Sequence, residues 1–264
     1  MRTVVYILCI IMFFSGLSSA ELKQPTYHKG DYWEYKIIGG TDLMPYEGTL
    51  RYEIKNETTI TANGESYDVW EIFSSSTRRP TDANYYYNMT VISYHRKSDD
   101  AVVKQIWKYD YFSPYGVGTY QVERTYKNIQ PDLEFPVNVG NAWERHSQFE
   151  YRIIDTGEND TAESYRYYEC IGTSKEKTDV GKFLCYVIKT WSNSSSDYSL
   201  AYYSNKVGNI VKSVTYSNNT VVESMMLTAY KYGINNGGLP SFEIYAIIIA
   251  VIITFITSRK MKVS

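Results

Sequence analysis

The chain has 264 residues, of which 44% are hydrophobic and 21% charged, and its formal net charge is −2. These proportions exclude a disordered chain and a coiled coil. The mildly acidic balance argues against a nucleic-acid partner, which would require a basic face. Tyrosine is unusually frequent, with 28 Tyr against 9 Phe and 5 Trp, and because Tyr favours strands the composition predicts a β-rich protein.

The first 20 residues have the pattern of a secretory signal peptide. Arg2 precedes an apolar run that ends at Phe14, and Ser18-Ser19-Ala20 supplies the small residues that signal peptidase recognises. We predict cleavage after Ala20. The alternative is an uncleaved N-terminal anchor, but the apolar run has only the length of a signal sequence.

Residues 21–125 are predicted to form a first β domain. Apolar and polar residues alternate there with a period of two, which is typical of strands. The expected strands are Tyr32–Ile38, Thr49–Lys55, Tyr67–Phe73, Tyr85–Ser93 and Val102–Tyr109. The segment from Tyr111 to Pro131, which contains several Gly and Pro, is predicted to link this domain to the next.

Residues 126–233 are predicted to repeat this domain. Residues 30–34 (GDYWE) match 140–144 (GNAWE), and residues 94–104 match 203–212 in the same order and at nearly the same offset. A repeat of this length indicates duplication of a whole domain. We expect turns at the two glycines and core positions for the two tryptophans, with ligand contact as the alternative; these residues are Gly30, Gly140, Trp33 and Trp143.

The second unit contains its own strand signals. Lys182–Trp191 is apolar on both faces, as expected of a central strand covered on both sides. Val207–Tyr216 and Val221–Tyr232 alternate, and Asn218-Asn219 is predicted to be the turn between them. The sequence therefore predicts an all-β fold of two tandem, antiparallel, curved-sheet domains that each resemble a half-barrel.

Two cysteines remain once Cys9 leaves with the signal peptide. If residues 174–181 form a hairpin turn, Cys170 and Cys185 are equidistant from its centre and face each other. Such a pair can form a disulfide in an oxidising compartment, and the alternative is two buried free thiols. Two cysteines without a neighbouring His do not complete a zinc site.

Five Asn-x-Ser/Thr sequons fall between the two terminal segments. They are a mild excess over chance and are predicted to be glycosylation candidates, with ordinary turn residues as the alternative at any one site. These residues are Asn56, Asn88, Asn159, Asn193 and Asn218.

The C-terminal end is predicted to anchor the chain in a membrane. Residues 234–240 form an Asn- and Gly-rich stem, residues 241–258 an apolar helix, and residues 259–264 a basic tail. Because the basic cluster marks the cytoplasmic side, the ectodomain is expected outside the cell and the C-terminus in the cytoplasm. A buried core helix is the alternative for so short an apolar run.

This end also resembles the archaeal sorting signal of the PGF-CTERM type, in which a Pro-Gly-Phe motif precedes an apolar helix and a basic end. Here the motif is Pro240-Ser241-Phe242-Glu243, with Ser in place of Gly. The resemblance implies that the tail is removed and exchanged for a lipid. Because the glycine is replaced, we favour simple anchoring.

Three motifs of the second unit resemble a family of secreted bacterial and archaeal proteins. They are residues 135–143 (FPVNVGNAW), 181–189 (GKFLCYVIK) and 202–212 (YYSNKVGNIVK). In that family FPxxVGxxW opens the domain and YSxKVGx(I/V)VK forms a late hairpin. The resemblance implies a domain similar to the half-barrels of periplasmic lipoprotein carriers, whose concave face holds an acyl chain, and it implies no catalytic residues.

The sequence contains no recognised catalytic motif. His28, His95 and His146 have no metal-binding spacing, and neither a nucleophile elbow, a P-loop nor a dinucleotide fingerprint occurs. The acidic residues 155–160 are interpreted as a turn, because they lack the spacing of a calcium loop. We therefore expect no enzyme, no cofactor and no metal.

The predicted function is that of a membrane-anchored cell-surface glycoprotein with a non-catalytic ectodomain that binds partners or has a structural role in the envelope. One alternative is a carrier or sensor of a lipid or other hydrophobic ligand, which unfilled concave faces of Val, Ile and Met would favour. A second alternative is a glycan-binding module, which an exposed row of Tyr would favour; the candidates are Tyr85, Tyr86, Tyr87, Tyr109, Tyr111, Tyr115 and Tyr120.

Overall fold

The computed structural model describes residues 21–41, 44–80, 86–113, 116–192 and 196–233. These residues contain twelve strands and no helix, so the predicted all-β class is confirmed. The strands are β1 (Tyr32–Thr41), β2 (Met44–Ala62), β3 (Glu65–Pro80), β4 (Tyr86–Arg96), β5 (Val102–Ser113), β6 (Gly116–Tyr126), β7 (Ala142–Ile153), β8 (Asn159–Thr178), β9 (Gly181–Trp191), β10 (Tyr198–Ser204), β11 (Asn209–Ser217) and β12 (Thr220–Lys231).

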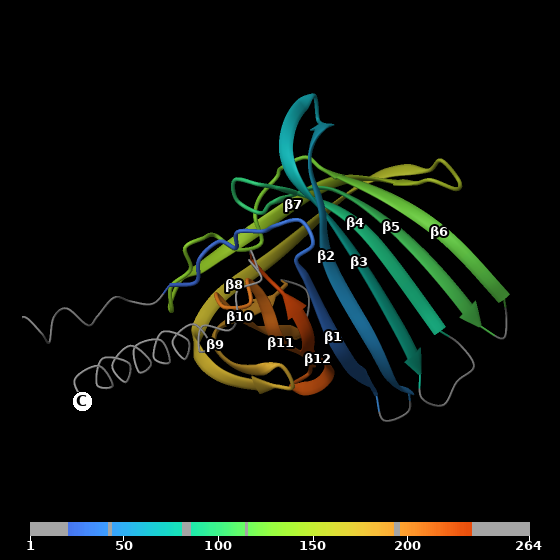
Figure 1. The fold of residues 1–264 in the computed structure, drawn as a ribbon. Coiled ribbons are helices and arrows are strands. Elements are labelled where there is room, and N and C mark those ends of the chain that lie inside the picture. The colour runs from blue at the N-terminus through green and yellow to red at the C-terminus, as the bar shows by residue number, and fades with distance from the viewer. Residues whose placement is uncertain (1–20, 42–43, 81–85, 114–115, 193–195, 234–264) are drawn as a thin grey trace, which may run out of the picture. The chain divides into compact units, whose positions relative to one another are not determined.

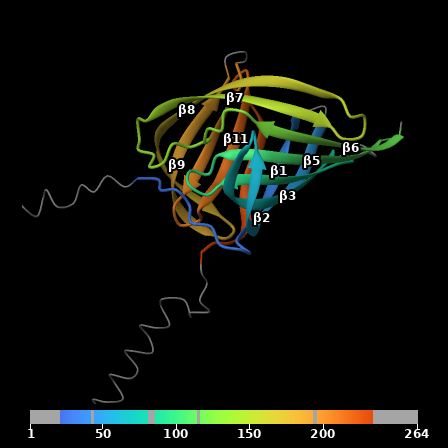
Figure 2. The same cartoon turned by 90° about the horizontal axis from the view of Figure 1, so that it is seen from above.

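The strands form one closed antiparallel barrel. Each strand pairs with its neighbours in the chain, and β1 closes the sheet by pairing with β12 from Tyr32↔Lys231 to Gly39↔Glu223. Strands β2 to β6 form a broad, strongly twisted part of the sheet, and β9 to β12 curl tightly (Figure 1). The long strands β7 and β8 join these two parts along one side (Figure 2).

The period-two pattern of the sequence places one set of side chains inside the barrel. Trp33, Tyr35 and Ile37 of β1 are buried, whereas Lys36 between them is exposed. The largest buried cluster joins these residues to side chains of β9, β11 and β12, among them Phe183, Val211 and Leu227. Burial of this one face fixes the strand register, because a shift by one residue would turn the whole set outward.

Two turns at matching positions of the predicted repeat have the same backbone conformation. Gly30 and Gly140 have positive φ angles of 87° and 89°. The Gly30 N–H donates to the Ile54 carbonyl of β2, and the Gly140 N–H donates to the Cys170 carbonyl of β8, at 2.8 Å in both cases. In each turn a side-chain oxygen of the next residue, Asp31 or Asn141, accepts the N–H of the residue three positions earlier. The expectation that these glycines form turns is confirmed.

The prediction of two separate domains is not confirmed. The described residues from Glu21 to Tyr232 form one compact unit, and each half of the predicted repeat supplies six consecutive strands to the same sheet. The pairings β1–β12 and β6–β7 join the halves. A six-stranded half alone would have two unpaired edges, and closure removes both of them.

The predicted linker is partly wrong. Residues Gly116–Tyr126 are strand β6, which pairs with β5 along its whole length, and the connection between the halves is confined to residues 127–141. The glycines that suggested a linker lie in the sheet, where the Tyr111 ring packs over Gly118 at a distance that leaves no room for a side chain.

The predicted disulfide between Cys170 and Cys185 is wrong, because the hairpin turn is shorter and lies nearer to β9 than expected. The ladder continues to Thr178↔Gly181, so Cys185 pairs with Ser174 and Cys170 with Ile188, beyond a bulge. Both cysteines are free and buried, and they belong to different core clusters. The alternative of two buried thiols is the one that the structure supports.

Several predictions concern residues outside the described ranges. These are the signal peptide, the stem at 234–240, the apolar helix at 241–258 and the tail at 259–264. Within the described ranges, no helix has the length and apolar character needed to cross a membrane.

Candidate functional site

A pocket of about 600 Å³ lies at the end of the barrel where β1 begins and β12 ends. Both halves of the chain build it. The first half contributes side chains of β1 to β4 and of the β4–β5 turn, and the second contributes residues 132–135 and the β10–β11 turn. Because its parts lie far apart in the sequence, the pocket depends on closure of the barrel.

The N-terminal segment from Glu21 to Gly30 crosses this end of the barrel (Figure 1) and forms one wall of the pocket. Leu22 and Val137 exchange two backbone hydrogen bonds of 2.8 and 2.9 Å. The Lys23 N–H donates to Asn205 Oδ1, and the Thr26 N–H donates to the Tyr232 hydroxyl. The segment is therefore held by the connection between the halves and by the last strands.

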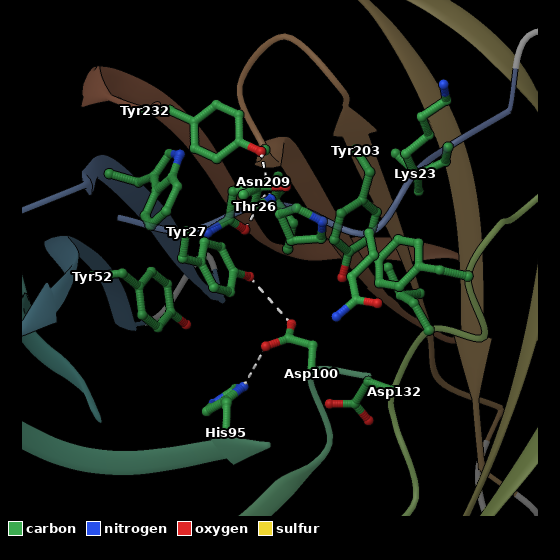
Figure 3. Close-up of a pocket in the computed structure, with 18 of the residues that line it drawn as sticks. Lys23, Thr26, Tyr27, Tyr52, His95, Asp100, Asp132, Tyr203, Asn209 and Tyr232 are labelled. Carbon is green, nitrogen blue, oxygen red and sulfur yellow. Dashed lines mark hydrogen bonds and ion pairs between the residues drawn. The ribbon is translucent and has the colours of Figure 1, made fainter. Parts of the chain in front are cut away.

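A chain of hydrogen bonds joins three polar side chains in the pocket (Figure 3). His95 Nδ1 lies 3.0 Å from Asp100 Oδ1, and the Tyr27 hydroxyl donates to Asp100 Oδ2 at 3.2 Å. Asp100 occupies the left-handed position of the β4–β5 turn with φ of 63°, a conformation that Asp tolerates. The equivalent turn position in the second half is Gly208, and the equivalent of His95 is Tyr203, so only the first half carries this chain.

The electrostatics of His95 favour its charged form. Burial acts to lower the pKa of His95, but the carboxylates of Asp100 and Asp132 outweigh burial, and the pKa is raised above its ordinary value. Burial and the neighbouring Asp100 carboxylate raise the pKa of Tyr27 far above its ordinary value. Asp100 thus lies between a histidine that favours its charged form and a neutral tyrosine.

A second carboxylate of the pocket, Asp132, is hydrogen-bonded to side chains of β7 and β8. Arg145 Nη1 and the Tyr168 hydroxyl both donate to its Oδ1, and Trp143 Nε1 donates to its backbone carbonyl at 3.0 Å. Burial acts to raise the pKa of Asp132, but Arg145 and the other donors outweigh it and the pKa is lowered. Arg145 is 6% exposed and Asp132 49% exposed, which places the open side of the carboxylate toward the pocket.

The remaining walls combine aromatic rings with free hydroxyl groups. Phe135 and Tyr232 supply ring surface, whereas Trp33 in the same wall is only 1% exposed. Tyr52 and Tyr203 also line the space (Figure 3), and their hydroxyl groups have no hydrogen-bond partner among the described residues. Ser74 is only 7% exposed, lines the pocket and likewise has no side-chain partner in the described part of the chain.

The two predicted core tryptophans differ. Trp33 is 1% exposed and donates its Nε1–H to the Val207 carbonyl at 2.8 Å, so its core position is confirmed, and one face of it also borders the pocket. Trp143 is only half-buried and stacks on Tyr168 at 5.4 Å. Its Nε1–H donates to the Asp132 carbonyl, so Trp143 contacts the connection between the halves.

The predicted sequons lie in different environments. Asn56, Asn159 and Asn218 are exposed, Asn88 is partly buried with an enclosed and unpartnered Oδ1, and Asn193 lies outside the described residues.

The other candidate side chains do not join the pocket. His146 stacks on Tyr165 and contacts Glu163, and His28 neighbours Asp31. Tyr87, Tyr109 and Tyr120 stack on one another on the sheet β4–β6, whereas Tyr85 and Tyr115 are not among the described residues. The described ranges contain no group of three or more potential metal ligands.

Sequence reasoning missed the polar residues of the pocket. His95 and Asp100 flank a hairpin turn, and this spacing could have suggested a contact between them. Nothing local marks Asp132 or the N-terminal segment, because their partners Arg145, Tyr168 and Val137 lie in other elements.

We predict that His95 titrates above the ordinary histidine pKa of about 6.5. Since the pKa is raised in the folded state, the associated stability is present below the unfolded pKa and is lost as the pH rises through the folded one. An NMR titration of the full chain with labelled histidine checks this. The variant Asp100→Asn is expected to lower the pKa of His95, whereas Asp99→Asn, which removes a partner of Arg96, serves as the control. An unchanged titration in Asp100→Asn would contradict the assignment.

Comparison with known proteins gives little further identification. No family model matches the chain, and no curated protein matches it by sequence. One solved structure, a candidate exported protein of Bacteroides fragilis with a YmcC-like fold, is similar at 14% identity and a TM-score of 0.41. The match covers 80% of this chain and 100% of that one. A likeness at this level assigns neither a family nor a function.

Proposed function

We propose that this protein is a non-catalytic, membrane-anchored cell-surface protein whose barrel binds a small ligand in the pocket at its end. The observation that carries the proposal is the pocket itself. Its volume of about 600 Å³ falls within the range of roughly 300–1,000 Å³ that is usual for small-molecule sites, and a few polar groups converge in it between aromatic walls. The signal-peptide pattern, the apolar tail and the exposed sequons support the location.

The equivalent turns around Gly30 and Gly140 support a further part of this proposal, in which the barrel consists of two fused half-barrels. The pocket then lies between the halves, and its polar residues are at positions where the two copies have diverged. The suggested relation to secreted half-barrel proteins with an FPxxVGxxW motif is consistent with this origin.

The lining favours a polar ligand over a lipid. The lipid-carrier alternative requires concave faces of Val, Ile and Met without filling side chains. In this barrel, rings and aliphatic side chains fill the largest core cluster, and the remaining pocket contains Asp100, Asp132 and His95. An acyl chain in contact with these groups would remove them from water without replacing their hydrogen bonds, which is unfavourable.

The test is whether small molecules enter this pocket. Ser74 lines it, whereas Ser76, two residues further along the same face of β3, is buried outside it. We expect Ser74→Cys in the full chain to react with a neutral maleimide at least about tenfold faster than the control Ser76→Cys, because the reagent reaches only accessible thiols. Cys170 and Cys185 give little background, because burial raises the pKa of Cys170 and raises that of Cys185 to about 12. Cys9, where it is retained, contributes equally to both variants. Equal rates for the two variants would overturn the proposal.

A further inference from the structure

We infer that the ligand of the pocket is a neutral polyhydroxylated molecule of one or two rings, such as a mono- or disaccharide. This inference rests on the proposed function and deepens it. Three features of the described residues carry it: the balance of charge, the unpartnered hydroxyl groups and the aromatic walls.

Both carboxylates of the pocket have a partner that can neutralise them. Asp132 is paired with Arg145, and Asp100 is paired with His95 when His95 is protonated. The exposed Lys23 also lines the pocket and adds one positive charge. A cationic ligand would compete with Arg145 and His95 for these carboxylates, and an anionic ligand would meet both carboxylates. Since burying a charge without a partner is costly, an uncharged ligand fits this arrangement best.

The free polar groups of the pocket match those of a polyol. The hydroxyl groups of Tyr52, Tyr203 and Ser74 have no partner within the described ranges, and each can both donate and accept a hydrogen bond. A ligand hydroxyl has the same dual capacity, and the open side of Asp132 can accept from further hydroxyl groups. Leaving such groups unpaired beside an apolar ligand is unfavourable, because each buried one loses its hydrogen bonds to water.

The aromatic walls suit the apolar faces of a sugar ring. Phe135 and Tyr232, which are both partly exposed, border the same space as the hydroxyl groups. A ring that carries C–H groups on its faces and hydroxyl groups around its edge can contact both kinds of wall at once, since Tyr and Trp combine apolar area with a polar tip. The N-terminal segment crosses the pocket at Leu22 and Thr26, which disfavours a long polymer lying through it.

The experiment measures binding of defined probes to the full chain in lipid nanodiscs, by saturation-transfer NMR and calorimetry. The probes are glucose, galactose, N-acetylglucosamine and maltose, with lauric acid and tyramine representing the apolar and cationic classes. We expect at least one sugar to bind saturably and to slow maleimide labelling of Ser74→Cys. Tyr203→Phe, which keeps the ring and removes the hydroxyl, is expected to weaken this binding by about tenfold.

Tyr165→Phe is the matched control, because Tyr165 is exposed and lies outside the pocket. Its sugar affinity is expected to equal that of the unaltered chain.

If lauric acid or tyramine protects Ser74→Cys while all four sugars fail, the ligand class is wrong and the proposed function stands. If Ser74→Cys reacts with the maleimide but none of the probes binds or slows the labelling, the sugar inference is also overturned. Sugar binding that Tyr203→Phe leaves unchanged would place the sugar elsewhere. An unreactive Ser74→Cys would instead refute the pocket function itself.

Discussion

Replacing Trp33 by alanine is expected to lower the free energy of unfolding by about 3–5 kcal/mol, as for other buried tryptophans. The side chain is fully enclosed, donates a hydrogen bond to the Val207 carbonyl, and packs edge-on against Tyr27 at 5.8 Å. It also contacts Tyr232 at 5.9 Å. Its loss would open a cavity where the start of the barrel meets its end.

The comparison variant is Trp143→Ala. Because Trp143 is half-buried, its removal is expected to cost less, at about 1–2 kcal/mol. Chemical denaturation of the full chain, followed by circular dichroism, measures both losses. Equal losses for the two variants would mean that the repeated tryptophans have the same structural role, contrary to their different surroundings.

Replacing Arg145 by methionine is expected to destabilise the protein by about 2–4 kcal/mol, because it leaves Asp132 without its cationic partner. The estimate is lower than for a fully enclosed pair, since Asp132 is 49% exposed. The connection between the halves should loosen as well, because Asp132 receives hydrogen bonds from three residues of the wall. Thermal unfolding of the full chain measures the change.

Two further variants make this prediction specific. Arg152→Met changes an exposed arginine of the same strand and is expected to be nearly neutral. The double variant Arg145→Met with Asp132→Asn should recover part of the loss, because the uncompensated carboxylate is removed together with its partner. If the losses of the two single variants simply added in the double variant, the pair would not be coupled.

Most strands could be predicted because their signals are local. The alternation in Tyr32–Ile38 and the Asn218-Asn219 turn require only neighbouring residues, and both are observed, the turn with φ angles of 49° and 64°. The cysteine pairing failed because one bulge and a two-residue turn at the β8–β9 hairpin shift the register. A strand prediction does not fix such details, since register also depends on turn geometry.

The pocket could not be predicted because none of its relations is local. Asp132 depends on Arg145 across a turn, Tyr27 reaches Asp100 from the other end of the first half, and Tyr203 approaches from the second half. The sequence identified Gly30 and Trp33 as repeated positions. It did not indicate that His95 and Asp100 of the first half come together in a pocket, where the matching positions of the second half are Tyr203 and Gly208.

The pairing of β1 with β12 has a consequence for the order of events during folding. Tyr32 can pair with Lys231 only once the last strand has been synthesised, whereas the other edge of β1 can pair with β2 much earlier. Contacts between residues so far apart in the sequence form slowly. A chain that emerges N-terminus first therefore leaves one edge of β1 unpaired until its synthesis is nearly complete, and an unpaired strand edge promotes aggregation.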